Sequence, residues 1–193
     1  YPHRKDDDKT GGVDIYEAPY KNLKDQVPHN LYVLCHDPYG QNQSADSMSL
    51  GAAYILKRTN NISQPDDLIV ASYVGRPHTQ DEYNKNLFML ADYYNCKIGF
   101  ENDRGEVIAY AKRHRKLHRL QEEFEMLDKK ELRSKTVKRQ YGMHMTEARK
   151  RQGEIYIRDW LNTVRSKDES GVQTLNLHKV YDLALLQELI KFN

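Results

Sequence analysis

The stretch Leu31-Tyr32-Val33-Leu34-Cys35-His36-Asp37-Pro38-Tyr39-Gly40 decides the fold of this chain. Its first six residues are mostly apolar, with β-branched and aromatic side chains, which favours a buried strand. Proline cannot donate to a strand ladder and glycine permits a sharp turn, so the strand ends close to Asp37. A carboxylate delivered at the carboxyl end of a central strand either caps a turn or holds a metal.

Length and composition limit the classes of protein to which this chain can belong. The chain has 193 residues, a formal net charge of +2 and 30% charged residues, and its mean hydropathy is -0.89. This length fits one domain, or one domain with a tail. No run approaches the roughly 18 apolar residues of a membrane span. Two cysteines, Cys35 and Cys96, favour a reducing compartment over a disulfide scaffold.

Further strands are expected on both sides of the first one. Residues 1–28 show little periodicity and are expected to form a linker or edge segment, with one short strand over Val13–Tyr16. The domain proper is expected over residues 29–193. Within it, Leu50–Lys57 predicts a second strand that pairs with the first as a hairpin, and Leu68–Val74 predicts a third.

The pattern then changes to a helical period. Thr79-Gln80-Asp81-Glu82 has the spacing of a capping box, and apolar residues follow at helical intervals to near Asn95. Lys97–Glu101 predicts a fourth, short strand, which also ends in a carboxylate. Three consecutive strands, a crossing helix and a strand parallel to the first define the predicted fold. It is α/β, with a central mixed sheet of three antiparallel strands followed by parallel strands, flanked by helices.

The last third of the chain predicts smaller elements. Thr146 and Asp182 are expected to cap two helices. The expected elements are a helix over residues 106–114, a helix over 146–163, a loop over 166–171, an edge strand over 175–180 and a last helix over 183–192.

The two strand-end acids point to metal chemistry. Asp37 and Glu101 end strands that this topology places side by side, about 4.8 Å apart. Like charges this close are unfavourable unless a cation lies between them. Oxygen ligands favour Mg²⁺ or Mn²⁺, and two such ions can support phosphodiester hydrolysis. The alternative is two surface acids at strand ends, and for His36 it is a packed or hydrogen-bonded ring.

Basic residues suggest a polyanionic partner. The predicted contacts to duplex DNA are Lys112, Arg113, Arg115 and Lys116, and a second basic region spans residues 129–151. The alternative for the first set is an ordinary solvated helix face. No phosphate loop of the Gly-x-x-x-x-Gly-Lys-Ser/Thr type occurs, so these residues do not form a nucleotide-driven motor of that type.

Three motifs together resemble the nuclease domain of tailed-bacteriophage terminase large subunits. They are His36–Gly40, Ser49–Tyr54 and Gly99–Gly105, and the similarity runs from about Val13 to the end of the chain. The resemblance implies an RNase H-like fold and a two-metal endonuclease, using Mg²⁺ or Mn²⁺, that cuts concatemeric viral DNA during genome packaging. It also implies a terminase ATPase domain, a small terminase subunit and a portal as partners, in the host cytoplasm.

The same resemblance assigns the acids. Asp37 matches the first-strand metal ligand and Glu101 the fourth-strand ligand, while Asp46 falls in a loop where the family often carries another acid. The family's third carboxylate normally follows the late Leu-Leu-x-Glu-Leu helix, so the chain is expected to stop before it. Asp182 is the late acid with a plausible catalytic placement, and a helix cap is its alternative. Asp103 is a substitute ligand, with a turn as its alternative.

Because the third acid is expected to be absent, metal affinity and cleavage are expected to be weak. Two other functions stay open on the sequence. One is another RNase H-like nuclease, of the junction resolvase or RNase H type. The other is a module that grips DNA or the portal without cutting.

Overall fold

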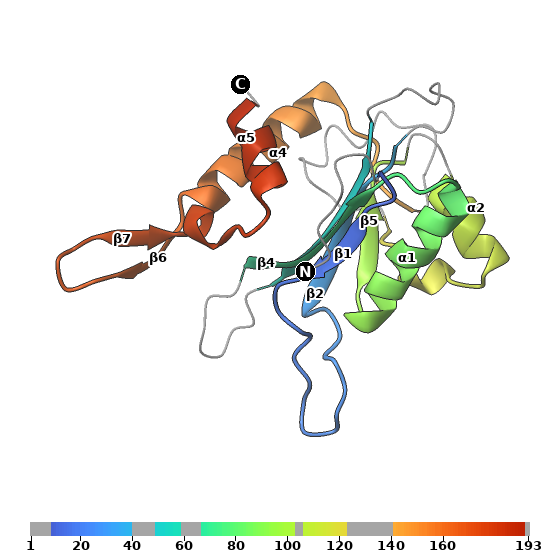
Figure 1. Cartoon of the computed structure of the whole chain (residues 1–193), viewed down its shortest axis with the longest axis horizontal. Helices are drawn as coiled ribbons and strands as arrows, with labels where there is room; N and C mark the ends of the chain where they lie inside the picture. The colour runs from blue at the N-terminus through green and yellow to red at the C-terminus, as the bar shows by residue number, and fades with distance from the viewer. Residues whose placement is uncertain (1–8, 40–48, 59–66, 103–105, 123–140, 192–193) are drawn as a thin grey trace.

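The computed structural model describes residues 9–39, 49–58, 67–102, 106–122 and 141–191. Helices lie on both faces of a five-stranded sheet (Figure 1). No helix within these ranges is long and apolar enough to cross a membrane. The elements are β1 (Gly12–Ile15), β2 (Tyr32–Asp37), β3 (Gly51–Lys57), β4 (Leu68–Gly75), α1 (Gln80–Tyr93), β5 (Lys97–Phe100), α2 (Glu106–Arg113), η1 (Leu117–Arg119), α4 (Glu147–Leu161), β6 (Val164–Lys167), β7 (Gln173–Leu175), η2 (Asn176–Lys179) and α5 (Leu183–Lys191).

The strand order of the sheet is β1-β4-β3-β2-β5. β2 pairs antiparallel with β3 and parallel with β5, so the strand that ends at Asp37 is an interior one. The predicted hairpin and the predicted parallel neighbour are both confirmed. β1 pairs antiparallel with β4 and forms the edge, close to the short strand expected over Val13–Tyr16. The fold is therefore α/β, with a mixed sheet that contains one parallel strand pair among the described residues.

The core lies between the sheet and α1. Alternate residues of β2, including Leu34 and His36, face this layer, and Tyr83, Leu87 and Phe88 of α1 are fully buried against it. The Thr79 hydroxyl caps α1 by accepting a hydrogen bond from the Glu82 amide at 3.1 Å, as the sequence predicted.

The outer edge of β5 is covered by two short segments. Leu120 bridges Ile98 in parallel, and Met143 bridges Glu101 in the same sense. The Met143 amide donates to the Phe100 carbonyl at 2.8 Å. Residues 120–121 and 141–143 therefore extend the sheet beyond β5 and hold the backbone at Glu101 on the side away from β2.

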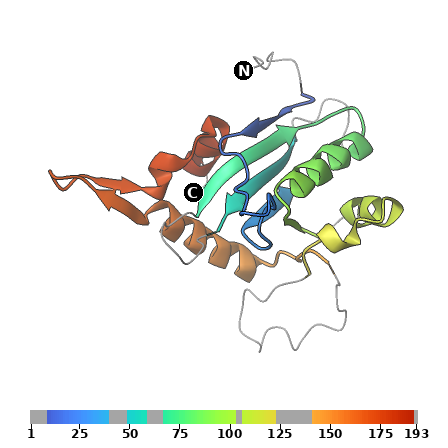
Figure 2. The ribbon, with the colours of Figure 1, turned by 90° about the horizontal axis from the view of Figure 1, so that it is seen from below.

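The C-terminal elements pack on the other face of the sheet. Trp160 of α4 donates its indole N–H to the Asp67 carbonyl at 2.8 Å, and the ring of Tyr181 lies 5.9 Å from that of Tyr16. Figure 2 shows α4 running along the sheet while the β6–β7 hairpin projects from the body. Thr146 caps α4 and Asp182 caps α5, as predicted.

One prediction for this part of the chain is right only in part, and a second is wrong for most of its residues. Residues 166–171 are predicted as a loop: residues 168–171 do lie in the loop between β6 and β7, whereas Ser166 and Lys167 end β6, which pairs with β7 as a hairpin. Of residues 175–180, predicted as an edge strand, Leu175 ends β7 but Asn176–Lys179 form η2. The Leu175 amide donates to the His178 ring at 2.9 Å, at the point where η2 begins.

Candidate active site

The site that the sequence predicted lies at the carboxyl ends of β2 and β5. His36 pairs directly with Phe100 across these parallel strands, and the next residues along are Asp37 and Glu101. Successive side chains of a strand point to opposite faces, and His36 faces α1. Asp37 and Glu101 therefore share the opposite face, on strands spaced about 4.8 Å apart.

The residues next to this pair on the adjoining strands have small side chains. Asp37 pairs with Ala52 of β3, and Gly99 lies two residues before Glu101 on the same face. Neither residue has a side chain larger than a methyl group. The two carboxylates thus share a face with small side chains at Ala52 of β3 and Gly99 of β5.

This arrangement fits a divalent cation. Two carboxylates from separate strands supply hard oxygen ligands, which suit Mg²⁺ or Mn²⁺. Among the described residues, no group of three or more His, Cys, Asp or Glu side chains is arranged to hold a metal. Asp46 and Asp103, the other predicted ligands, lie outside the described residues. Of the predicted metal ligands, only Asp37 and Glu101 therefore lie among the described residues.

Behind Asp37, the sheet rests on a buried aromatic layer. The His36 ring stacks on Tyr83, with centroids 5.3 Å apart, and its Nδ1 donates to the Ala52 carbonyl at 3.1 Å. Burial lowers the pKa of His36 to about 4, against a smaller opposing effect of that hydrogen bond. His36 is neutral at pH 7, which confirms the alternative of a packed, hydrogen-bonded ring.

Tyr83 completes this layer. Burial raises the pKa of its hydroxyl, and the neighbouring Tyr73 and Tyr39 hydroxyls and the Asp37 carboxylate raise it further. The ring of Tyr39 meets Tyr83 edge-on at 5.3 Å. Asp37 is thus backed by neutral aromatic groups.

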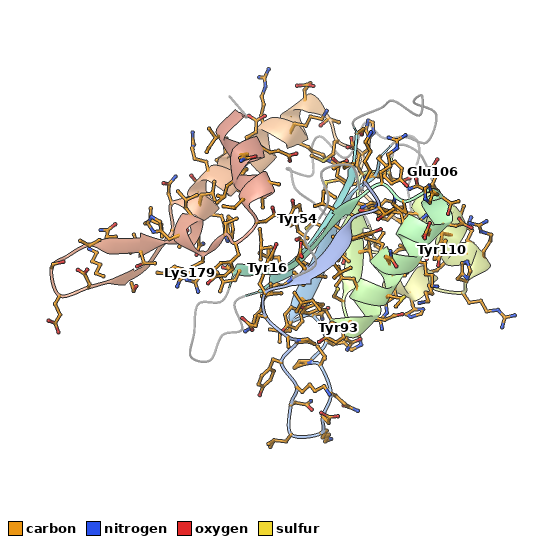
Figure 3. All side chains as sticks on the ribbon, in the orientation of Figure 1. Tyr16, Tyr54, Tyr93, Glu106, Tyr110 and Lys179 are labelled. Carbon is orange, nitrogen blue, oxygen red and sulfur yellow. The ribbon has the colours of Figure 1, made fainter. Side chains whose placement is uncertain are left out.

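Asp182 has a structural role on the face of the sheet that carries Asp37. Its Oδ1 accepts hydrogen bonds from the amides of Ala184 and Leu185 at 2.9 and 3.2 Å, which confirms the helix-cap alternative. The pKa of Tyr54 is raised, first by burial and then by the carboxylates of Asp182 and Glu188 and a hydrogen bond with Asp182. Tyr54 lies between the sheet and α5 (Figure 3). Since Tyr54 is two residues from Ala52 on β3, Asp182 lies on the same face as Asp37.

The predicted DNA contacts lie on the side of the sheet that α1 and α2 cover. Arg113 pairs with Asp81 of α1 at 2.5 Å, and Lys116 pairs with Asp92 of α1 at 2.6 Å. Lys112 and Arg115 are exposed near the end of α2. Because α1 and α2 cover the face opposite to the Asp37 carboxylate (Figure 1), the structure does not bring these cations together with the acids.

One charged residue near the site was missed by the sequence analysis. Arg149, in the first turn of α4, is 3% exposed and donates to the His144 carbonyl at 2.6 Å. His144 follows Met143, which bridges Glu101. A buried guanidinium thus lies beside the segment that pairs with a candidate ligand. Nothing in the residue pattern separates Arg149 from the other cations of the 129–151 basic region.

No protein-family model and no curated protein matches this chain.

Proposed function

We propose that this chain is a metal-dependent DNA endonuclease domain of the RNase H-like kind. In this proposal it is the nuclease part of a phage terminase large subunit and cuts concatemeric viral DNA during packaging. The observation that carries the proposal is the shared position of Asp37 and Glu101, one residue beyond the His36–Phe100 pair on the same face of parallel strands.

The topology supports the proposal. Omitting the edge strand β1, the sheet reads β4-β3-β2-β5, with three antiparallel strands and a last strand parallel to β2. α1 makes the crossover between β4 and β5. This is the arrangement that the resemblance to terminase nuclease domains implies, and it sets the two acids on neighbouring strands.

The chemistry follows from the acids. Asp37 and Glu101 would hold Mg²⁺ or Mn²⁺ through their carboxylate oxygens. When bound, such ions activate water and stabilise the leaving oxygen of a phosphodiester. The buried layer of His36 and Tyr83 fixes the end of β2, and the bridge to Met143 fixes the backbone of Glu101. The chain therefore contributes a rigid pair of ligands, which is what positioning of a reacting phosphate requires.

The partners follow as part of the same proposal. They are double-stranded DNA, a terminase ATPase domain, a small terminase subunit and a portal, in the host cytoplasm. Asp46, Asp103 and Asp182 are the candidates for further acidic ligands, and the capping bonds of Asp182 weigh against that role for it.

Plasmid relaxation and linearisation in Mn²⁺ tests the proposal. Wild type is expected to nick or cut supercoiled plasmid, while Asp37→Asn and Glu101→Gln are expected to lose this activity. Asp159→Asn, an exposed acid on α4, is the matched control and should cut like wild type. Branched and RNA-hybrid substrates divide a terminase nuclease from a resolvase or RNase H type. Activity that survives in both variants would refute the assignment.

A second candidate is a module that binds DNA without cutting it. The observation in its favour is that the described residues hold no three-acid group, while Asp182 is engaged as a cap. DNA binding by gel shift, with no cutting in Mn²⁺ by wild type, supports this candidate. Cutting that depends on Asp37 excludes it.

A further inference from the structure

A pocket of about 290 Å³ lies at the end of the sheet opposite to the acids. It is built by the loops that precede β2 and β5, the residue after β3, and η1. Five of its lining side chains are cationic or can become so: Arg58, Lys97, Arg119, His29 and His118. None of the described residues that line it is acidic. The pocket therefore concentrates positive charge on a chain whose formal net charge is only +2.

One of the cations is fixed in place. Arg119 has a side chain only 17% exposed. Its Nε donates to Asp92 at 2.8 Å and its Nη1 to Asn95 at 2.9 Å. Asn95 is itself held by donating its amide to the Val27 carbonyl at 2.9 Å. This wall of the pocket is therefore set before any ligand enters, which lowers the entropy cost of binding.

The other two permanent cations of the pocket are Arg58 and Lys97. Arg58 and Lys97 are exposed residues, and within the described part of the chain neither forms an ion pair. Like charges gathered around one cavity repel each other, and an anion between them removes that repulsion. Asn30 and Gln121 add side-chain amides, which can donate hydrogen bonds to the oxygens of an anion.

We propose that this pocket binds a phosphate group. A phosphate dianion matches several converging cations better than a single carboxylate does, and guanidinium groups suit phosphate oxygens in particular. The volume is close to the lower limit of about 300 Å³ for small-molecule pockets. A phosphate with an attached nucleoside, or one at the end of a nucleic acid strand, therefore fits better than free phosphate alone.

This site is separate from the acid pair. The pocket is lined by Tyr32 at the start of β2, whereas Asp37 ends that strand. Five steps of roughly 3.3 Å each place the two ends about 17 Å apart. One phosphate cannot occupy both places. The inference therefore does not rest on the proposed nuclease activity, and phosphate binding can be measured without cleavage.

Isothermal titration calorimetry at low ionic strength tests the inference with three probes: inorganic phosphate, adenosine 5′-monophosphate and adenosine. We expect the two phosphate-bearing probes to bind and adenosine not to bind. The double variant Arg58→Ala/Lys97→Ala should bind them at least tenfold more weakly. Lys85→Ala, an exposed lysine on α1, should bind like wild type. Arg119 is left unchanged because it ties η1 to α1, and thermal melting checks that the double variant is folded.

A fourth titration separates the two sources of the phosphate. A short duplex with a 5′-phosphate is compared with the same duplex without it. Tighter binding of the phosphorylated duplex, lost in the double variant, assigns the pocket to a nucleic acid end. Equal binding of the two duplexes, with adenosine 5′-monophosphate still bound, assigns it to a free nucleotide. Equal affinity for adenosine and its monophosphate, or unchanged affinity in the folded double variant, overturns the inference.

Discussion

Asp37 and Glu101 stand one residue beyond His36 and Phe100, a directly paired couple on the parallel strands β2 and β5. This relationship gives the two carboxylates the same face and neighbouring strands, although 63 residues of chain separate them. The crossover through α1 creates the parallel pairing, and the bridge to Met143 holds its far side. The acids are thus positioned by the pairing of β2 with β5 and by the bridge at Glu101.

Metal binding is expected to stabilise the fold. A ligand at 100 times its Kd adds about 2.7 kcal/mol to the free energy of unfolding. For a domain of this size, that corresponds to a rise in Tm of roughly 5 to 10 °C. Wild type should show such a rise in saturating Mn²⁺, whereas Asp37→Asn and Glu101→Gln should lose most of it. Differential scanning fluorimetry with and without EDTA measures the effect. A full shift in both variants places the metal elsewhere.

Asp182 offers a test that separates a helix cap from a metal ligand. Asparagine caps helices as well as aspartate does, whereas alanine costs about 1 kcal/mol at such a position. Since Oδ1 of Asp182 accepts two amides of α5, Asp182→Asn should keep wild-type stability and Asp182→Ala should lose about 1 kcal/mol. Urea denaturation measures both. If Asp182 is only a cap, Asp182→Asn also keeps the wild-type Kd for Mn²⁺ in calorimetry.

His36 makes the fold sensitive to acid. Burial lowers its pKa from 6.5 to about 4 in the folded chain, while the unfolded chain keeps the ordinary value. Between pH 6.5 and 4 the unfolded state therefore binds the proton and the folded state does not. The free energy of unfolding therefore decreases as the pH drops through this range, and His36 accounts for roughly 3 kcal/mol of the decrease.

The variant His36→Phe isolates this contribution. Phenylalanine keeps an aromatic ring against Tyr83 but cannot be protonated. The free energy of unfolding, measured by urea denaturation at pH 7, 5.5 and 4, should fall less steeply in His36→Phe than in wild type. Identical slopes for the two proteins show that His36 does not govern the acid sensitivity.

Much of the sheet follows from local rules that the sequence carries. β2 ends where Pro38 forces it to, α1 begins at the Thr79 cap, and the apolar runs of β3 and β4 match the strands within one residue or two. The side-by-side placement of Asp37 and Glu101 came from topology, because a helical crossover between strands of one sheet favours a parallel neighbour.

Other features depend on contacts that no local pattern carries. The β6–β7 hairpin is polar and exposed, so its strands lack the apolar alternation that marks a buried strand. The burial of Arg149 and the separation of Lys116 from the acids depend on how helices pack on the two faces. The cationic pocket combines residues from four separate segments, which sequence spacing does not connect.

Two glycines give opposite predictions for the same substitution. A Cβ at Gly51 would lie 2.7 Å from Tyr39 Cδ1 and 2.7 Å from Tyr83 Cζ, in the aromatic layer behind Asp37. Overpacking of this kind typically costs 1–3 kcal/mol, so Gly51→Ala should lower the free energy of unfolding by about 2 kcal/mol. A Cβ at Gly153, inside α4, meets nothing within 4 Å. Gly153→Ala should raise stability by about 0.5–1 kcal/mol, because alanine is the better helix former.

Urea denaturation of the two variants beside wild type checks both signs. Gly51→Ala should also weaken Mn²⁺ binding, since shifting Tyr39 and Tyr83 disturbs the end of β2 that carries Asp37. Gly153→Ala should leave the Kd for Mn²⁺ unchanged. A Gly51→Ala protein as stable as wild type contradicts the tight packing of this layer. Unchanged Mn²⁺ affinity in a destabilised Gly51→Ala protein contradicts the effect of this layer on Asp37.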